Sequence, residues 1–258
     1  HTAARYFLLN NRGAIAPGYL GDFVIIDNFN DFNIEMVFKR GELMYDGQLR
    51  DFPTPEIDPY LVKRAHDTFH LTKLTAEDFK DGRPHAIIGL VPGEIISEDA
   101  GYIDHIDVEY DILKVAVIER HKNTHHIGLG YIKGYGLKSG AVATSISHDS
   151  HNIIVVGTNE EEMAAAANRI VENHGGITVM ENGNVLGEVT LAIAGIMSDD
   201  PLVMVNSALE SAKDEAFRLG VSRDIDPFMT LSFMALPVIP TLRITTRGVF
   251  DVNTQRYI

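Results

Sequence analysis

A proline-rich segment divides this chain of 258 residues into two blocks. Pro53, Pro55 and Pro59 fall within seven positions, and proline lacks the amide hydrogen that helices and inner strands donate. We therefore predict a linker over residues 51–65. It separates a first block, residues 1–50, from a second, residues 66–258, and the chain is long enough for two domains of ordinary size.

The first block carries the pattern of short β-strands. Residues 23–27 form an apolar run, and residues 36–39 and 42–45 flank a two-residue connection of the kind found in hairpins. Residues 2–7 are typical of the tail of a helix, and a natural amino terminus seldom begins inside an element, so we expect a missing upstream part. Three short strands are marginal unless something else covers them.

The second block alternates strands with two helices. A capping box at residues 158–161 predicts a helix that Gly175-Gly176 stops, and Asp200-Pro201 predicts a second helix that ends before Gly220. Strands are predicted over residues 108–110, 114–118, 141–147, 153–156, 177–180 and 185–191. This order is not a regular βαβ repeat, so we predict an α+β domain with a mixed or antiparallel sheet and packed helices.

Composition and charge exclude several classes of partner. The net charge of −14 and the scattered basic residues argue against nucleic acid. No apolar run is long enough to span a bilayer and no signal peptide opens the chain, so we expect no membrane partner. The absence of cysteine excludes disulfides and thiolate chemistry, fits a cytoplasmic location, and leaves His, Asp and Glu as the available metal ligands.

The most informative polar stretch is Ser147-His148-Asp149-Ser150-His151-Asn152, directly ahead of the apolar run at residues 153–157. Two histidines beside an aspartate at a strand end suit metal ligation or proton transfer. A simple strand-connecting corner would explain the aspartate, the second serine and the asparagine through local backbone hydrogen bonds. It would leave both histidines without a role. Because residues three apart on an extended chain face opposite sides, only one imidazole need face a cleft.

Other patterns carry weaker signals. The glycines at residues 128–136 lack the spacing of a phosphate-binding loop, so they predict a strand that another backbone approaches closely. His66 and His70 share one face of a predicted helix, but no third ligand follows, which favours a solvated face. His121 follows a predicted strand and can turn toward the two corner histidines, either as a third ligand or as a proton relay.

Several separated blocks resemble the carboxy-terminal domain of bacterial and archaeal adenine deaminases. They are residues 134–141, 149–157 (Asp-Ser-His-Asn-Ile-Ile-Val-Val-Gly), 194–199 (Ala-Gly-Ile-Met-Ser-Asp) and 235–240 (Ala-Leu-Pro-Val-Ile-Pro). Upstream, residues 12–22 resemble the segment that follows the barrel in amidohydrolases. The blocks stand in the same order as in that family, and the resemblance covers nearly the whole chain.

The resemblance implies hydrolytic deamination of adenine to hypoxanthine and ammonia, with water activated by a divalent metal pair of manganese, iron or zinc. It places the metal ligands on a (β/α)8 barrel upstream of His1 and none in this chain. It also implies that residues 1–50 are the returning half of a short β-sandwich and residues 66–258 the adenine deaminase C-terminal α+β domain. We expect the isolated chain to be inactive.

The same resemblance assigns roles to the corner at residues 147–152. His148, Asp149 and His151 become candidate accessory residues at the mouth of the barrel, with the aspartate fixing an imidazole tautomer. The candidate substrate-binding residues are Ser147, Ser150, Asn152 and His121. The expected partners are adenine, the barrel domain and further copies of the chain in a homo-oligomer.

Two alternatives remain open. The chain can serve as a non-catalytic scaffold or oligomerisation module, for which the large apolar side chains of residues 228–236 would supply an interface. It can also be a stand-alone metal hydrolase built on His121, His148 and His151.

Overall fold

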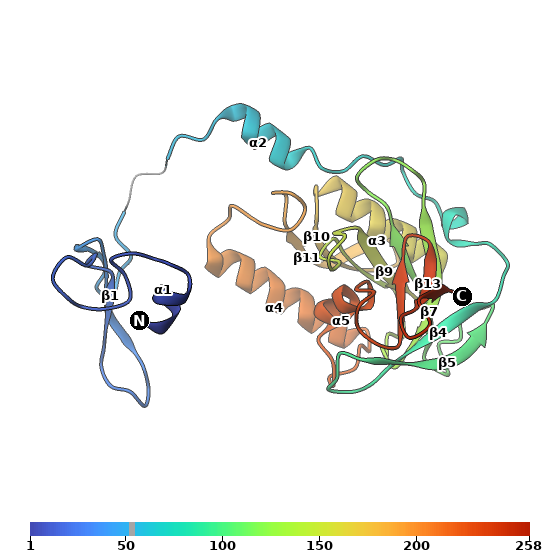
Figure 1. The fold of residues 1–258 in the computed structure, drawn as a ribbon. Helices are drawn as coiled ribbons and strands as arrows, with labels where there is room; N and C mark the ends of the chain where they lie inside the picture. The colour runs from blue at the N-terminus through green and yellow to red at the C-terminus, as the bar shows by residue number, and fades with distance from the viewer. Residues whose placement is uncertain (52–54) are drawn as a thin grey trace. The chain divides into compact units, whose positions relative to one another are not determined.

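The computed structural model describes residues 1–51 and 55–258, which divide into two compact units, His1–Ile57 and Asp58–Ile258 (Figure 1). Part of the predicted linker, Phe52, Pro53 and Thr54, lies outside the described residues. The division into residues 1–50, 51–65 and 66–258 stays a prediction.

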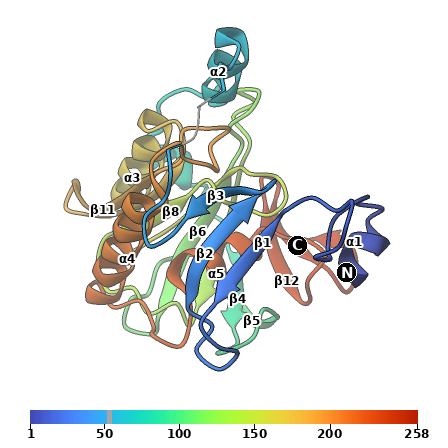
Figure 2. The same cartoon turned by 90° about the vertical axis from the view of Figure 1, so that its left-hand side faces the viewer.

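The first unit is a small antiparallel sheet with one short helix. Helix α1 spans Thr2–Tyr6, and strands β1 (Phe23–Ile26), β2 (Ile34–Lys39) and β3 (Glu42–Tyr45) lie side by side in that order (Figure 2). The predicted strands and the hairpin are confirmed. Among the described residues of this unit only Ala4 is buried, so the sheet has no core of its own.

The second unit is built on an eight-stranded mixed sheet with the order β11-β10-β8-β9-β6-β7-β4-β5. Its strands are β4 (His85–Leu90), β5 (Ser97–Ile103), β6 (Ile112–Ile118), β7 (Ile127–Lys133), β8 (Ala141–Thr144), β9 (Ile153–Gly157), β10 (Gly176–Glu181) and β11 (Asn184–Thr190). Only the β4–β7 pair is parallel among the pairings of this sheet in the described residues. The sheet is open, and the predicted α+β class is confirmed.

Helices cover both faces of this sheet (Figure 1). Helix α3 (Glu160–Glu172) packs on the face that carries Ala116 and Val155, while α4 (Leu202–Arg218) and α5 (Pro227–Met234) pack on the face that carries Val115 and Val156. Successive side chains of a strand point to opposite faces. A strand buried on both faces is therefore a continuous apolar run, as residues 115–118 and 153–157 are.

Smaller elements complete the second unit. Helix α2 spans Pro59–His66, a short 3-10 helix η1 spans Ala76–Phe79, and β12 (Leu242–Thr245), β13 (Gly248–Asp251) and β14 (Arg256–Tyr257) form a separate sheet. This sheet approaches β7 so closely that a Cβ atom at Gly128 would lie 1.8 Å from the carbonyl oxygen of Thr245. The predicted close approach of another backbone at the glycine-rich strand is confirmed.

Three local predictions are wrong. Residues 108–110 form a turn, because the chain reverses there through a bridge between Asp107 and Ile112. Asn159, not Thr158, caps α3 by accepting the amide of Glu162 at 2.8 Å, since the helix begins one residue later than predicted. Helix α4 likewise begins after Pro201, not at it.

Two further predictions need correction in extent. Strand β8 ends at Thr144 instead of at residue 147. Helix α2 ends at His66, so His70 lies beyond it and the two histidines share no helical face. Among the described residues, no helix combines the length and apolar character needed to cross a membrane.

Candidate functional site

The corner, residues 147–152, connects the end of β8 to the start of β9 and is held by backbone hydrogen bonds. The amide of His151 donates to the carbonyl of Ser147 at 2.6 Å, and the amide of His148 donates to the carbonyl of Ser232 at the end of α5 at 3.2 Å. His151 adopts a left-handed backbone with φ of 49°. The corner is thus a tight reversal that rests on α5.

The two corner histidines have different surroundings. The His148 ring packs on Phe233 with a centroid distance of 5.2 Å, and its Nδ1 lies 3.8 Å from Oδ1 of the exposed Asp149 carboxylate. That distance is longer than a hydrogen bond. The Nδ1 of His151 is instead buried and has no hydrogen-bond partner among the described residues, and an unsatisfied buried polar atom calls for an explanation in function or bound water.

Burial lowers the pKa of His151 below its ordinary value, and the positive charge of Arg120 and the neighbouring His148 lower it further. Asp149 acts in the opposite direction but does not outweigh them. This shift favours the neutral imidazole, which offers one donor nitrogen and one acceptor nitrogen, as a proton relay requires.

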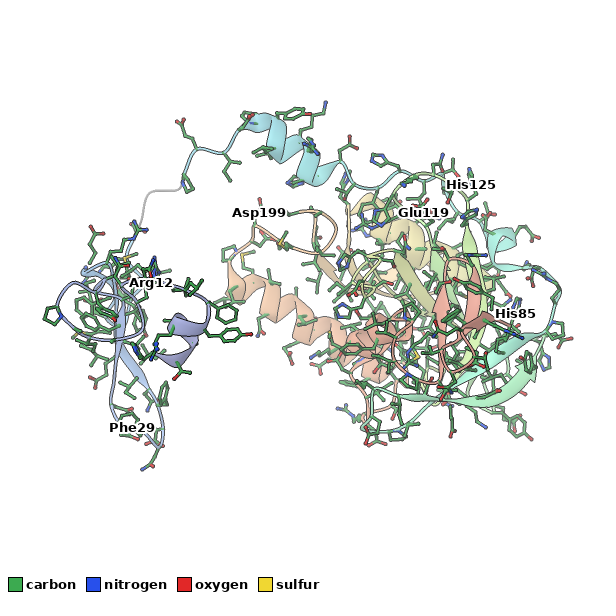
Figure 3. The ribbon with its side chains drawn as sticks, viewed as in Figure 1. Arg12, Phe29, His85, Glu119, His125 and Asp199 are labelled. Atoms are coloured by element: carbon green, nitrogen blue, oxygen red, sulfur yellow. The ribbon has the colours of Figure 1, made fainter. Side chains whose placement is uncertain are left out.

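His121 supports the corner from the neighbouring loop. Its Nε2 lies 2.8 Å from the carbonyl oxygen of Ser150, to which it donates. Its loop, between β6 and β7, carries Glu119 and His125 (Figure 3). The carboxylate of Glu119 organises this loop by accepting hydrogen bonds from the amides of His121, Lys122 and Thr124. Partial burial raises the pKa of Glu119, but these backbone donors outweigh it and the pKa falls below its ordinary value.

Arg120 is the residue of this site that the sequence reasoning missed. Its side chain is buried and donates to the carbonyl oxygens of Thr68, His151 and Ala194. The only sequence signal is its position directly after a buried strand, where a side chain lies at the same sheet edge as the corner.

A groove with a volume of about 310 Å³ opens beside the corner. Its wall combines the corner with the segment after α5 and the turn between β12 and β13: Asp149, Ser150, Asn152, Ala235, Leu236, Pro237, Val238, Thr245 and Thr246. Of the predicted site residues, Asp149, Ser150 and Asn152 therefore share this groove. Ser147, His148, His151 and His121 lie outside its wall, and Ser147 has a buried hydroxyl without a partner among the described residues.

Within residues 1–51 and 55–258, no three His, Asp or Glu side chains are close enough together to hold a metal ion. The residues of the corner do not form a metal centre by themselves.

Comparison with known proteins gives a consistent result. The family model described as the adenine deaminase C-terminal domain matches residues 94–256. A protein named adenine deaminase from Dehalococcoides mccartyi is 40% identical over 99% of this chain and 46% of its own length. Adenine deaminase 2 from Carboxydothermus hydrogenoformans is 40% identical over 98% of this chain and 45% of its own length. Adenine deaminase 1 from Rhizobium johnstonii is 42% identical, also over 98% and 45%. The chain thus spans less than half the length of these relatives.

Proposed function

This chain belongs to the adenine deaminase C-terminal domain family, and from that premise we propose that it is the carboxy-terminal portion of an adenine deaminase. The reaction is hydrolytic deamination of adenine to hypoxanthine and ammonia. The metal-activated water and its ligands belong to a barrel outside these residues, and this chain contributes accessory groups to the substrate pocket.

The observation that carries the proposal is the convergence of three separated blocks at one sheet edge. Residues 147–152 share a groove with residues 235–238, and Arg120 joins the carbonyl of His151 to that of Ala194. These are the blocks that resemble adenine deaminases. Two of these blocks line one groove and the third is tied to the same corner by Arg120, which supports a shared role in a site.

We assign the corner a role in binding or proton transfer, not in metal ligation. His151 lies outside the groove wall, so its neutral imidazole, with an Nδ1 that has no partner among the described residues, suits the relay of a proton and not direct contact with the purine. His121 supports the Ser150 backbone, and Ser150 and Asn152 offer polar groups within a partly apolar groove of about 310 Å³, which is large enough for a flat base.

The first unit fits a structural role in the same protein. Its sheet has exposed apolar side chains on adjacent residues, Val24 and Ile25, and a stacked pair, Phe23 and Phe38, with a centroid distance of 4.7 Å. A sheet that is apolar on both faces is stable when other strands cover it. We propose that strands from outside this chain complete a β-sandwich here.

The test is an assay of ammonia release from adenine with divalent metal added. The chain is assayed alone and then mixed with the amino-terminal half of the Dehalococcoides mccartyi relative. Activity only in the mixture is the expected result, and it must fall in His148→Ala or His151→Ala relative to the wild-type mixture. Full activity of the chain alone would favour a stand-alone hydrolase. No activity in a mixture that forms a complex would favour a scaffold.

A further inference from the structure

Arg120 is a buried guanidinium without a carboxylate partner. Its side chain is almost fully buried, and among the described residues no Asp or Glu forms an ion pair with it. Nε donates to the carbonyl of His151, Nη1 donates to the carbonyl of Thr68 at 2.8 Å and to its hydroxyl at 3.1 Å, and Nη2 donates to the carbonyl of Ala194 at 2.9 Å. The same guanidinium lies 4.2 Å above the ring of Phe69.

Desolvation makes such an arrangement costly, because a buried cation with only neutral partners loses the hydration that an ion pair would replace. Burial accordingly lowers the pKa of Arg120 to about 10, and Glu119 offsets this only in part. The guanidinium still carries its charge at pH 7. A purely apolar core contact would fill the same space without this cost.

The surrounding backbone is shaped to accept this side chain. Gly195, with φ of 76°, has no Cβ, and one built there would lie 2.8 Å from Nη2 of Arg120. The amide of Arg120 also donates to the side chain of Asn152 at 3.4 Å. Arg120 therefore contacts His151, Asn152 and the loop at residues 194–195 at the same time.

We propose that Arg120 is the positioning residue of the corner. Its planar fork of N–H donors fixes the carbonyl of His151 against the loop at residues 194–195 and the segment at residues 68–69. In this way it sets the position and the protonation state of the His151 imidazole. The positioning itself stands on the geometry of this chain, whereas its importance for turnover rests on the proposed function.

The charged and titratable groups around the imidazole of His151 are Arg120 and His121 from the β6–β7 connection and His148 and Asp149 from the corner itself. Burial is the largest cause of the lowered pKa of His151, and Arg120 exerts the largest effect of these charges in the same direction. Removing the guanidinium therefore removes a positive charge and admits water at the same time, and both changes favour protonation of His151.

The experiment follows the imidazole of His151 by NMR in the full 258-residue chain, labelled at histidine Cε1 and assigned with His151→Gln. In Arg120→Ala the pKa of His151 is expected to rise toward the ordinary value of about 6.5. Guanidinium chloride at low millimolar concentration, well below denaturing levels, is expected to lower it again. Arg120→Lys keeps a charge but loses the planar fork of donors. It is expected to shift the imidazole resonance of His151, and added guanidinium chloride is not expected to restore the wild-type titration.

Arg243 provides the matched control. It is also fully buried, its pKa is also about 10, and it donates to the carbonyls of Ile95 and Pro240. Among the described residues, none of its hydrogen bonds reaches the corner. Arg243→Lys is expected to leave the titration of His151 unchanged and to show no response to guanidinium. If Arg120→Ala does not fold, Gly195→Ala displaces the guanidinium while keeping Arg120 and is measured in its place.

A folded Arg120→Ala chain with an unchanged His151 titration would overturn the proposal. In the mixture with the amino-terminal half of the relative, Arg120→Lys is expected to lower kcat roughly 10- to 100-fold with a smaller change in KM, and to move the pH profile. If the wild-type mixture releases no ammonia, the proposed function fails. The NMR titration still decides whether Arg120 positions His151.

Discussion

The hydroxyl of Ser145 donates to the carbonyl oxygen of Gly195 at 2.5 Å and accepts the amide of Gly176 at 2.7 Å. Ser145 lies one residue past the end of β8 and is fully buried. Because Arg120 donates to Ala194, the loop at residues 194–195 is held at two consecutive carbonyls. This loop is therefore fixed to the sheet edge that carries the corner.

Ser145→Ala is expected to lower the free energy of unfolding by about 1–3 kcal/mol, because it leaves a buried amide and a buried carbonyl without their partner. Urea denaturation followed by circular dichroism measures the change. Ser198→Ala is the control, since its hydroxyl bonds to an exposed carboxylate of Asp200, and surface changes of this kind stay within about 0.5 kcal/mol. Equal stability of the two variants would contradict a structural role for Ser145.

Gly128→Ala is expected to destabilise the second unit by about 1–3 kcal/mol or more, because the new methyl group would overlap the carbonyl of Thr245. That carbonyl belongs to β12, so the β12–β14 sheet has to move away from β7. Hydrogen exchange measured residue by residue should show faster exchange in β12 and β13.

Gly89→Ala in β4 is the control for this substitution. There the three atoms nearest to the new methyl group belong to the side chain of the exposed Glu98, which can rotate away. Protection of β12 and β13 that stays unchanged in Gly128→Ala would show that the close approach does not hold this sheet in place.

An element of this fold is predictable from the sequence when the residue pattern that specifies it lies within the element itself. Strands at residues 153–156 and 185–191 were predicted because a buried or hairpin strand carries its pattern within itself. Residues 108–110 were wrongly predicted as a strand because their apolar and aromatic character suits one, while the reversal depends on Asp107 pairing with Ile112. Such a pairing is not visible in a local pattern.

The same limit applies to the candidate site. The corner was recognisable from its polar side chains, and its partner blocks from the resemblance. The partners of Arg120 come from residues 52, 31 and 74 positions away in sequence, and nothing local indicates that three carbonyls meet there. The groove beside the corner likewise depends on residues 235–238, which approach only in the folded chain.

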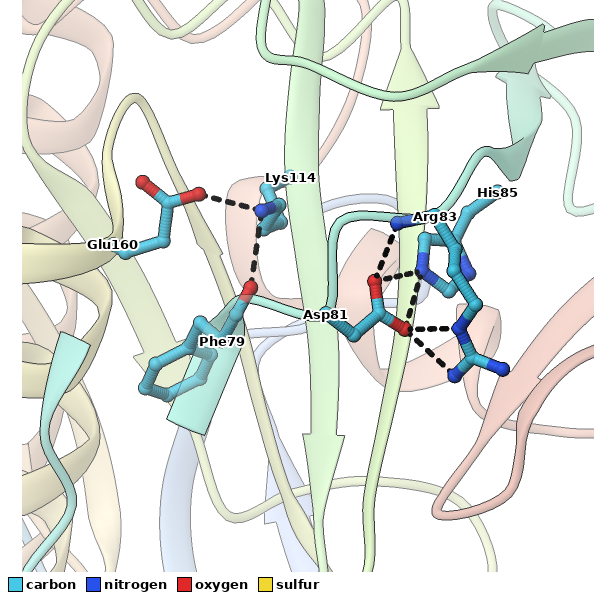
Figure 4. A network of polar contacts seen from close by, with 6 residues as sticks. All are labelled: Phe79, Asp81, Arg83, His85, Lys114 and Glu160. Atoms are coloured by element: carbon cyan, nitrogen blue, oxygen red, sulfur yellow. Dashed lines mark hydrogen bonds and ion pairs between the residues drawn. The ribbon is translucent and has the colours of Figure 1, made fainter. Parts of the chain in front are cut away.

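Asp81 predicts a pH dependence of stability. Partial burial raises its pKa, but hydrogen bonds from His85 and Arg83 outweigh this and lower the pKa to about 2, from 3.8 (Figure 4). A carboxyl with a depressed folded-state pKa contributes stability that is present above the unfolded pKa and lost as pH falls through the folded one. This contribution is therefore present above pH 3.8 and lost toward pH 2.

Asp81→Asn is accordingly expected to lower the urea midpoint at pH 6 and to differ less from the wild type as pH falls from about 4 toward 2. Asp104→Asn serves as the comparison, because Asp104 pairs with His105 at a fully exposed position. Its effect is expected to be smaller at every pH, as for other exposed pairs. A penalty for Asp81→Asn that does not change over this pH range would refute the linkage.

Lys114 joins three elements through a buried ammonium group. Its Nζ donates to the carbonyl of Phe79 at 3.0 Å and to the carboxylate of Glu160 at 2.5 Å (Figure 4). Lys114→Ala is expected to cost about 3 kcal/mol, because it leaves the partly buried Glu160 unpaired and opens a cavity. Lys114→Met, which fills the cavity, is expected to cost less.

Lys80→Ala is the control for Lys114, since the ion pairs of Lys80 with Glu77 and Glu161 are exposed. Its cost is expected to stay below about 1 kcal/mol. Urea denaturation at low and high salt distinguishes the ion pair of Lys114 from those of Lys80, because screening weakens exposed pairs far more than buried ones. A similar salt dependence of both variants would argue against the buried pair.

Asn152 tests the groove itself. Its side chain is mostly buried, lines the groove and accepts the amide of Arg120 at 3.4 Å. In the mixture that releases ammonia, Asn152→Ala is expected to raise KM for adenine roughly tenfold with a smaller change in kcat, because it removes a contact made equally in the ground and transition states.

Two further variants serve as comparisons. Asn152→Asp keeps the acceptor for the amide of Arg120 but loses the amide donor, so it distinguishes the support that Asn152 gives to the backbone from its contact with the base. Asn184→Ala, at the exposed turn between β10 and β11, should change neither constant. If Asn152→Ala leaves KM at the wild-type value, adenine does not occupy this groove.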